Sequence, residues 1–342
     1  MKIQGQVVRR GAVTRGFVET RGYAMGIGLR LPFVAVRGRS AGRTLVVLAA
    51  QHGRELNGPA AIHRVLRHLR PASMQGTILF FPVVHPVAVH THVQDFPTER
   101  TRSLRGKPPH NPINLNRNWP GDPRGTYHQR ITGALWPYIE RADLVLDLHG
   151  WTDRTVGLTW GQRYSAKHVR RFAFPWMEVH DAAPTHGMLE WACRRKKIPY
   201  VINESTPQDR VQPRSVDHVE RGILNLARGL EIIGGSIEHP PRSCELGGPS
   251  VTVAAEAFGL VVTDHIPGDI IDRGQVLLEV VDLERFRPVQ RVRAPSRMVV
   301  RNVGCTWGTG MLTHDVVQPG DTIGSLSSIA REYEHGRPVR KG

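Results

Sequence analysis

Short apolar runs alternate with segments of helical periodicity over the first two thirds of the chain. Residues 43–50 form a run of mostly apolar, branched side chains, which is typical of a buried strand. Residues 59–69 then carry apolar side chains at helical spacing, with Pro59 in the first turn, where its missing N–H is tolerated. A second apolar run follows at residues 76–84. A strand, a helix and a strand at this spacing form a βαβ unit, so the sequence predicts a largely parallel sheet.

The alternation continues to about residue 236, which makes the fold class α/β. Further strands are expected at residues 28–36, 142–148 and 200–203, and further helices at residues 129–138, 182–197 and 214–233. The strand at residues 28–36 is expected near an edge of the sheet. The last helix is strongly periodic, and Gly234 and Gly235 are expected to stop it.

The composition changes after residue 236, where the chain becomes rich in Pro and Gly. Residues 238–241 and 247–249 are expected to form a linker, and short Val-rich strands broken by turns follow. Pro-Gly-Asp occurs twice in these turns, at residues 267–269 and 319–321, which suggests a small barrel with internal near-symmetry. The expected units are a first domain over residues 1–236, a C-terminal β-barrel domain over residues 245–330, and a polar tail over residues 331–342 that frays.

The overall composition is that of an ordinary globular protein with room for two domains. The chain has 342 residues, of which 40% are hydrophobic and 22% are charged. No apolar run approaches the length of a membrane span, and residues 1–6 lack the apolar core of a signal peptide. We therefore expect a cytoplasmic protein without a membrane partner. The three cysteines form no C-x-x-C pair, which suits a reducing compartment and argues against a disulfide framework or a structural zinc knot.

The formal net charge of +16 fits binding to nucleic acid, an acidic small substrate, or only a basic proteome. No basic run is interleaved with aromatic residues, and the chain has no recognised nucleic-acid motif. The longest basic cluster, at residues 194–197, is expected at the polar end of a helix. We therefore expect a solvated basic surface and no nucleic-acid partner.

Three potential metal ligands follow predicted strands. His52 and Glu55 lie on the loop that leaves the strand at residues 43–50, and His149 lies at the tip of the strand at residues 142–148. Taken singly, each has a simpler interpretation as a loop or core residue, but carboxyl ends of parallel strands share one crevice. Two imidazoles and a carboxylate are ligands that zinc accepts, and a catalytic zinc keeps a fourth position open. Asp147, in an otherwise apolar strand, either orients a ligand or is a buried polar group paired with backbone.

Two further segments carry chemistry. Glu204 follows the strand at residues 200–203 and is either a general base that faces the metal or a turn residue that caps the next helix. Residues 85–127 show little periodicity, and long irregular segments in compact domains are usually functional or disordered. Within this segment, residues 114–121 combine amide, guanidinium and aromatic groups that suit a polar substrate.

These motifs together resemble the succinylglutamate desuccinylase/aspartoacylase family, a branch of the zinc carboxypeptidase superfamily. The matching segments are residues 46–58 for the strand and the H-G-x-E-x-x-G metal loop, 114–121 for the D-L-N-R-x-F-P-G substrate motif, 143–150 for the strand with the third ligand, 203–204 for the catalytic glutamate, and 251–329 for the C-terminal barrel. Four catalytic motifs in the right order, each at a predicted strand end or loop, make the resemblance specific.

The resemblance implies the fold and the roles of individual residues. The fold would be a three-layer αβα arrangement around a mixed, largely parallel sheet of the zinc carboxypeptidase type, with a C-terminal all-β barrel-sandwich domain. His52, Glu55 and His149 would bind one Zn²⁺ per chain, and Glu204 would be the general base and then the acid. The substrate-binding residues implied are Asn116 and Arg117, which would hold the substrate carboxylate. The second catalytic residue implied, beside Glu204, is Arg102, with Arg105 as the competitor, which would polarise the scissile carbonyl.

The activity implied is a zinc-dependent deacylase that hydrolyses the amide bond of a small anionic N-acyl amino acid. Two departures from the family pattern leave the substrate open: Asn114 replaces the first Asp of the D-L-N-R motif, and Trp119 replaces the usual Phe. The alternatives are a zinc carboxypeptidase that acts on peptides and a metal-free binding protein on the same fold. A homo-oligomer is left open.

Overall fold

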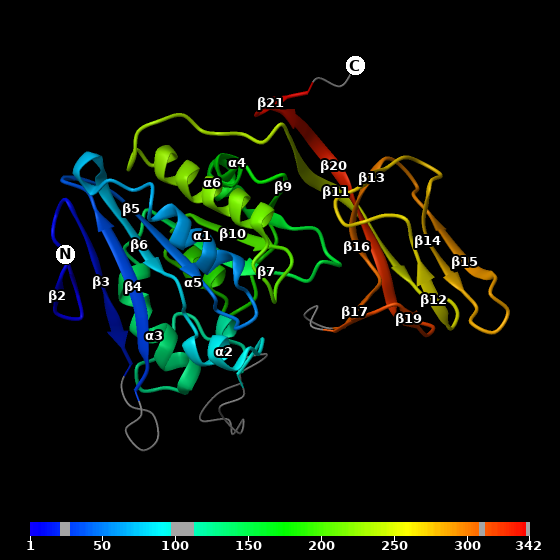
Figure 1. Ribbon diagram of the computed structural model, residues 1–342, viewed down its shortest axis with the longest axis horizontal. Helices are drawn as coiled ribbons and strands as arrows, with labels where there is room; N and C mark the ends of the chain where they lie inside the picture. The colour runs from blue at the N-terminus through cyan, green and yellow to red at the C-terminus, as the bar shows by residue number, and fades with distance from the viewer. Residues whose placement is uncertain (21–27, 97–112, 308–311, 340–342) are drawn as a thin grey trace.

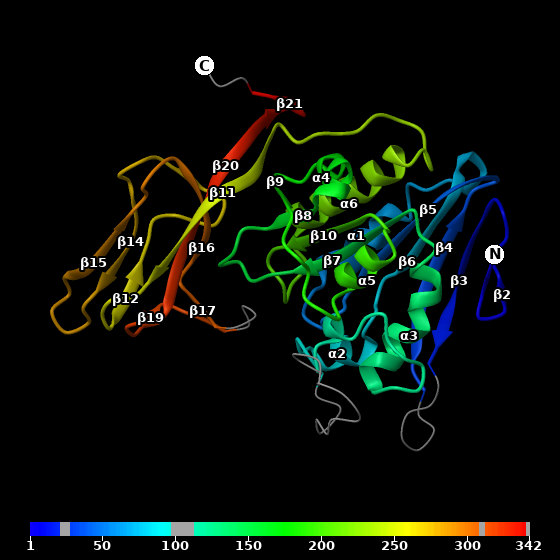
Figure 2. The ribbon, with the colours of Figure 1, turned by 180° about the vertical axis from the view of Figure 1, so that it is seen from behind.

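The computed structural model describes residues 1–20, 28–96, 113–307 and 312–339 of the chain. In the N-terminal part a mixed β-sheet lies between two layers of helices, and a strand-rich region follows at the C-terminal end (Figures 1 and 2). This arrangement confirms the predicted α/β fold with three αβα layers and a C-terminal all-β region.

The centre of the sheet is parallel and its edges are antiparallel. Its strands lie in the order β3 (Ala12–Glu19), β4 (Arg30–Arg37), β6 (Gln75–Phe81), β5 (Ser40–Ala49), β7 (Leu144–Gly150), β10 (Tyr200–Ser205), β8 (Leu158–Gln162) and β9 (Trp176–His180). β6, β5, β7 and β10 are mutually parallel, whereas β3 and β4 are antiparallel to their neighbours. β8 is antiparallel to β10 and parallel to β9. The parallel strands predicted from the apolar runs are β5, β6, β7 and β10.

Two sets of helices bury the two faces of this sheet. The helices on one face are α1 (Asn57–Val65), α4 (Ala166–Phe172) and α6 (Pro213–Gly229), and those on the other are α3 (Tyr127–Ile139) and α5 (Leu189–Arg195). In β5, Val47 packs in the core with Ile62 of α1, whereas Val46 packs with Leu135 of α3. Because both faces are covered, the strand is a continuous apolar run rather than an alternating one.

Short elements complete the N-terminal part. They are β1 (Lys2–Ile3), β2 (Gln6–Val7), α2 (Pro86–Thr91), and the 3-10 turns η2 (Pro71–Ser73), η3 (Leu115–Arg117) and η4 (Arg163–Ser165). The turn η3 lies in the aperiodic segment and carries two of the predicted substrate-binding residues.

The helix predicted at residues 182–197 is shorter in the structure. Gly187, just before α5, has a φ of +83°, which an L residue in a helix does not adopt. A Cβ at this position would collide with the carbonyl of Arg117, so the loop before α5 packs closely on η3. The last helix, α6, ends at Gly229 with Leu230 as its C-cap, before Gly234 and Gly235.

The C-terminal region contains two larger sheets that share an apolar core and a separate two-stranded sheet. Its strands are β11 (Arg242–Ala254), β12 (Gly259–Val262), β13 (Ile270–Ile271), β14 (Val276–Val281), β15 (Pro288–Arg293), β16 (Met298–Val303), β17 (Cys305–Trp307), β18 (Leu312–His314), β19 (Val316–Val317), β20 (Thr322–Glu334) and β21 (Arg337–Pro338). Leu278 of β14 and Leu326 of β20 meet in this core from opposite sheets. Both Pro-Gly-Asp sequences form turns between strands.

Two expectations for this region are wrong. Residues 247–249 are not linker but lie inside β11, at an irregularity in its pairing with β20. Residues 331–338 do not fray, because β20 continues to Glu334 and pairs with β21. The backbone of these residues is fixed by strand partners far away in the sequence.

The two parts of the molecule are joined in one continuous sheet. β11 pairs in parallel with β9, at Cys244 opposite Trp176. In addition, the loop 151–157 after β7 is bound to β16, since Val156 donates its N–H to the carbonyl of Arg301 at 2.8 Å. The boundary between domains at residues 236–245 stays a prediction. No helix in the described ranges is long and apolar enough to cross a membrane.

Candidate active site

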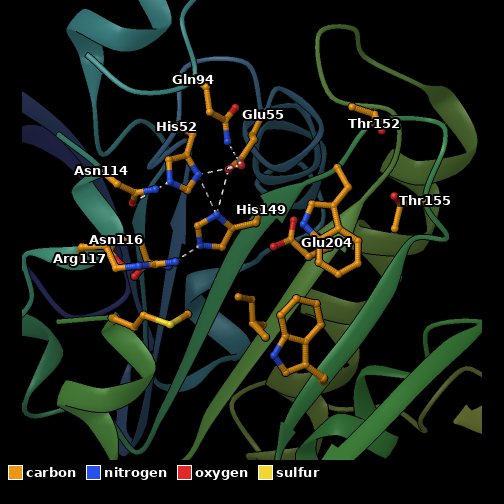
Figure 3. Close-up of a pocket in the computed structure, with 14 residues that line it drawn as sticks. His52, Glu55, Gln94, Asn114, Asn116, Arg117, His149, Thr152, Thr155 and Glu204 are labelled. Carbon is orange, nitrogen blue, oxygen red and sulfur yellow. Dashed lines mark hydrogen bonds and ion pairs between the residues drawn. The ribbon is translucent and has the colours of Figure 1, made fainter. Parts of the chain in front are cut away.

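Three side chains that are distant along the chain meet at the carboxyl ends of β5 and β7 (Figure 3). Nδ1 of His52 lies 2.8 Å from Oε1 of Glu55, and Nδ1 of His149 lies 3.0 Å from Oε2 of the same carboxylate. The two Nδ1 atoms are 3.3 Å apart. All three side chains are buried. One ligand atom from each residue lies within 4.8 Å of the others, so this cluster could hold a metal ion.

The donor atoms of this cluster fit a metal. Nε2 of His52 faces the amide oxygen of Asn114 at 3.2 Å, and Nε2 of His149 faces Oδ2 of Asp147 at 3.0 Å. Because these oxygens accept, both rings donate from Nε2, and the Nδ1 atoms face the shared carboxylate, where an ion would replace their protons. Burial opposes ionisation of Glu55, but the neighbouring charges of His52 and His149 lower its pKa to about 2. When an ion takes the place of the Nδ1 protons, two imidazoles and one carboxylate form the donor set of a catalytic zinc or similar ion.

Asp147 is a buried acceptor at the back of this cluster. Besides His149, it accepts a hydrogen bond from the hydroxyl of Tyr200 at 2.7 Å and from Nε2 of Gln51 at 2.8 and 2.7 Å. Oε1 of Gln51 in turn accepts from the indole N–H of Trp119 at 2.8 Å. Asp147 is therefore paired with side chains, one of which is the His149 ring.

Glu204 lies beside the cluster on the neighbouring strand. In the parallel ladder of β10 and β7, Glu204 is opposite His149, so the two side chains leave the same face of the sheet. Its Oε2 atom is buried and has no hydrogen-bond partner among the described residues. Burial raises the pKa of Glu204 well above its usual value; the charge of His149 opposes this, while those of Glu55 and Asp147 add to it. A buried carboxyl group with an elevated pKa is suited to hold a proton.

The predicted substrate-binding residues lie at the opposite side of the same cavity. Nδ2 of Asn116 is 3.3 Å from Nε2 of His149, and its Oδ1 accepts the N–H of Leu189 at 2.9 Å. Arg117 donates from Nη1 to the carbonyl of Asn116 at 2.6 Å, and burial lowers its pKa, against the opposing charge of Asp95. Arg102 and Arg105 lie outside the described residues.

The cavity between these groups has a volume of about 320 Å³. Its lining residues are His52, Glu55, Gln94, Asn114, Asn116, Arg117, His149, Trp151, Thr152, Thr155, Trp160, Met188, Ile202 and Glu204. A volume of this size accommodates one small molecule rather than an extended peptide.

Several of the polar residues here were not singled out from the sequence. Nε2 of Gln94 donates to Oε1 of Glu55 at 3.3 Å, and Oδ1 of Asp95 lies 3.9 Å from Nε2 of His52. Both residues belong to the aperiodic segment, where no periodicity points to a role. Gln51 stands at the start of the predicted metal loop and Tyr200 in a predicted apolar strand. Their polar side chains next to apolar runs were the signal that could have identified them.

The fold and the site define an α/β protein with a candidate metal centre at the carboxyl ends of its parallel strands. A family model described as the succinylglutamate desuccinylase/aspartoacylase catalytic domain matches residues 41–230. The chain belongs to the succinylglutamate desuccinylase/aspartoacylase family.

Named relatives extend this similarity over most of the chain. The chain is 26% identical over 317 residues to the N-alpha-acetyl-L-2,4-diaminobutyric acid deacetylase of Halomonas elongata, which covers 87% of this chain and 86% of that protein. The product-bound ectoine utilization protein EutE (DoeB) from Ruegeria pomeroyi has a TM-score of 0.74 at 20% identity, covering 92% of this chain and 94% of the other. A succinylglutamate desuccinylase/aspartoacylase from Rhodobacter sphaeroides also has a TM-score of 0.74 at 20% identity, covering 96% and 98%. The structural matches support the fold, and the family supports a hydrolase acting on amide bonds.

Proposed function

We propose that the protein is a zinc-dependent deacylase that hydrolyses the amide bond of a small N-acyl amino acid. The observation that carries this proposal is the convergence of His52, Glu55 and His149 on one buried point, with Glu204 beside them. The H. elongata relative, named for removal of an acetyl group from diaminobutyric acid, supports the same reaction class.

His52 and His149, through Nδ1, and Glu55, through its carboxylate, would hold the zinc ion. When bound there, zinc would lower the pKa of a water molecule toward neutrality and polarise the substrate carbonyl. Asn114 and Asp147 keep the two rings oriented by accepting from Nε2. These contacts fix the tautomer that presents Nδ1 to the ion.

Glu204 is the proposed proton carrier. In its ionised form it accepts a proton from the attacking water at Oε2, which has no hydrogen-bond partner among the described residues, and it then delivers this proton to the leaving amine nitrogen. Burial favours the protonated form that this delivery requires. Among the other predicted residues, Arg117 and Asn116 bind the substrate carboxylate, and Arg102, or its competitor Arg105, polarises the scissile carbonyl.

The decisive experiment measures amine release from N-acetyl amino acids by the purified protein. A chelator should abolish the activity, and zinc should restore it. Glu204→Gln should retain about one zinc per chain but lose about 100-fold or more in kcat. Full turnover in that variant would remove the role assigned to Glu204.

The second candidate is a carboxypeptidase on short peptides. The cavity volume of about 320 Å³ favours the smaller substrates. Dipeptides and tripeptides assayed beside N-acetyl amino acids decide between the two. A metal-free binding protein is the third candidate, and metal analysis of the purified protein tests it.

A further inference from the structure

An aromatic surface forms part of the lining of the cavity. Trp151, which follows β7, and Trp160, on β8, have ring centroids 5.3 Å apart with an interplanar angle of 26°, and each side chain is half-buried. Both line the cavity that also contains His149 and Glu204 (Figure 3). We call Trp151, Trp160 and Ile202 the apolar floor of the cavity.

The strand register places this floor next to the reacting groups. Glu204 and Ile202 lie two residues apart on β10, so they face the same side of the sheet. Ile202 is opposite Trp160 in the antiparallel ladder of β10 and β8. Two residues along a strand span about 6.6 Å. The apolar floor therefore begins about 6.6 Å along the strand from Glu204, beside which the scissile amide would lie. A substituent on the amide can span this distance.

The floor is held in place from behind. Leu158 of β8 forms a buried cluster with Leu246 of β11 and Val299 of β16, and the two indoles pack against this cluster. The loop that carries Trp151 is further bound by hydrogen bonds between Arg154, Val156 and the backbone of β16. The indole surface is therefore preformed rather than assembled around a ligand.

The charges in the cavity are arranged unevenly. Among the described lining residues, Arg117 is the only arginine or lysine, and it lies on the other side of the cavity from Glu204 and Thr155 (Figure 3). On the side of Glu204, Thr152 and Thr155 contribute hydroxyl groups to the lining (Figure 3). A second anionic substituent on a substrate would find no cation at the apolar floor within the described part of the lining. A flat apolar substituent would instead cover indole surface and remove it from water.

We propose that the preferred substrate is an N-acyl amino acid with an aromatic or bulky aliphatic group next to the scissile amide, and that this group packs on the apolar floor. The inference rests on the deacylase function proposed above and adds the chemical class of its substrate. The group can belong to the amino-acid side chain or to the acyl chain, since both adjoin the amide. Indole faces also attract ammonium groups, so a cationic side chain is the comparison that matters most.

Binding is measured first, with Glu204→Gln protein loaded with zinc, so that the ligands stay intact. The ligands for calorimetry are N-acetyl-L-phenylalanine, N-acetyl-L-alanine, N-acetyl-L-aspartate, N-acetyl-L-2,4-diaminobutyrate, N-benzoylglycine and N-acetylglycine. The proposal expects the phenylalanine derivative to bind about 10-fold or more tighter than the alanine derivative, or N-benzoylglycine to exceed N-acetylglycine by the same factor. Whichever pair shows the difference identifies the side that carries the group. Absence of both differences, or tightest binding by the aspartate or diaminobutyrate derivative, overturns the proposal.

Substitutions in the apolar floor then test which residues select the group. Trp160→Leu and Trp160→Ala should lower kcat/KM for the favoured aromatic substrate about 10-fold or more beyond any loss that they cause for N-acetyl-L-alanine. Trp191→Leu, on α5 outside the cavity, is the matched control and should leave the ratio of the two values unchanged. An equal loss on both substrates overturns the assignment of Trp160, and the leucine variant covers the case in which the alanine variant does not fold.

The two proposals fail in different ways. If the wild-type protein hydrolyses none of these amides but the Glu204→Gln protein binds the aromatic ones preferentially, the deacylase function is wrong and the apolar floor stands. If N-acetyl-L-alanine is hydrolysed without any aromatic preference in binding or turnover, the function stands and the apolar floor is wrong.

Discussion

The indole N–H of Trp119 donates to Oε1 of Gln51 at 2.8 Å, and this bond connects the substrate-motif segment to the candidate metal centre. Nε2 of Gln51 in turn donates to Asp147, and Asp147 also accepts a hydrogen bond from Nε2 of His149. A phenylalanine at position 119, as in the usual family motif, would fill similar space without the donor. The tryptophan at position 119 therefore has a hydrogen-bond acceptor in Gln51 that a phenylalanine would not use.

Trp119→Phe should destabilise the protein and weaken metal binding. The substitution leaves Oε1 of Gln51 buried without its donor, which costs about 1–3 kcal/mol in the free energy of unfolding. Zinc affinity should fall severalfold, because Asp147 and His149 lose part of their support. Urea denaturation and zinc competition with a chromogenic chelator measure the two effects. Trp136→Phe, on the partly exposed face of α3, is the control, and equal effects of the two variants would contradict the role of Gln51.

Asp147→Asn should lower zinc affinity by about 10–100-fold while keeping the shape of the side chain. The physical reason is that a neutral amide accepts more weakly from Nε2 of His149 and makes the ring a poorer ligand. The matched control is Asp143→Asn, just before the same strand, where the carboxylate accepts the N–H of Thr44 at 2.7 Å away from the cavity. Unchanged zinc affinity in Asp147→Asn would show that His149 does not need this acceptor.

The ion pair between Arg154 and Asp315 should act on substrate binding more than on catalysis. Their side chains meet at 2.7 Å and are each about one-third exposed, so the pair contributes about 0–1 kcal/mol to stability. Asp315→Asn should raise KM a few-fold, because Arg154 belongs to the loop that carries Trp151, and should leave kcat and zinc content nearly unchanged. Steady-state kinetics of the wild type and Asp315→Asn measure KM and kcat separately. A fall in kcat with constant KM would contradict a role of this ion pair in substrate binding.

Acid should destabilise the fold partly through His168 on α4. Burial, with the charges of Lys167 and Arg171, lowers the pKa of His168 to about 4, below the value of about 6.5 in an unfolded chain. As the pH falls, the unfolded state thus takes up a proton before the folded state does. The contribution of neutral His168 to the free energy of unfolding is therefore present above about pH 6.5 and is lost as the pH falls toward 4. The expected loss is about 1–2 kcal/mol at pH 5.

Urea denaturation at pH 7, 6 and 5 measures this loss. His168→Gln should make the free energy of unfolding less dependent on pH than in the wild type. His335→Gln, at an exposed turn, serves as the control. Parallel pH curves for the wild type and His168→Gln would exclude this histidine as a source of acid sensitivity.

The sequence predicted the parts of the fold that depend on local patterns. Runs such as residues 43–50 are buried on both faces, so their composition alone identifies them as central strands. Since parallel strands end at one edge of the sheet, the convergence of His52, Glu55 and His149 also followed from their positions after strands.

Features that depend on distant partners were not predictable. Residues 247–249 look like a linker but are held in β11 by β20, nearly eighty residues away along the chain. The same holds for Trp151 and Trp160, whose positions depend on Leu246 and Val299 of the C-terminal region. The helix predicted at residues 182–197 begins only after Gly187, where the backbone of Arg117 passes too close for any side chain. In each case the deciding contact is tertiary, and periodicity carries no information about it.

The ladder between β9 and β11 limits how molecules can enter the cavity. A swing of one half of the molecule against the other would break main-chain hydrogen bonds along this seam, so opening by rigid-body rotation about it is disfavoured. Substrate entry and product release would then depend on rotamer changes and small loop displacements at the mouth of the cavity. Enlarging the accepted range of molecules would accordingly require replacing rim side chains rather than loosening a hinge.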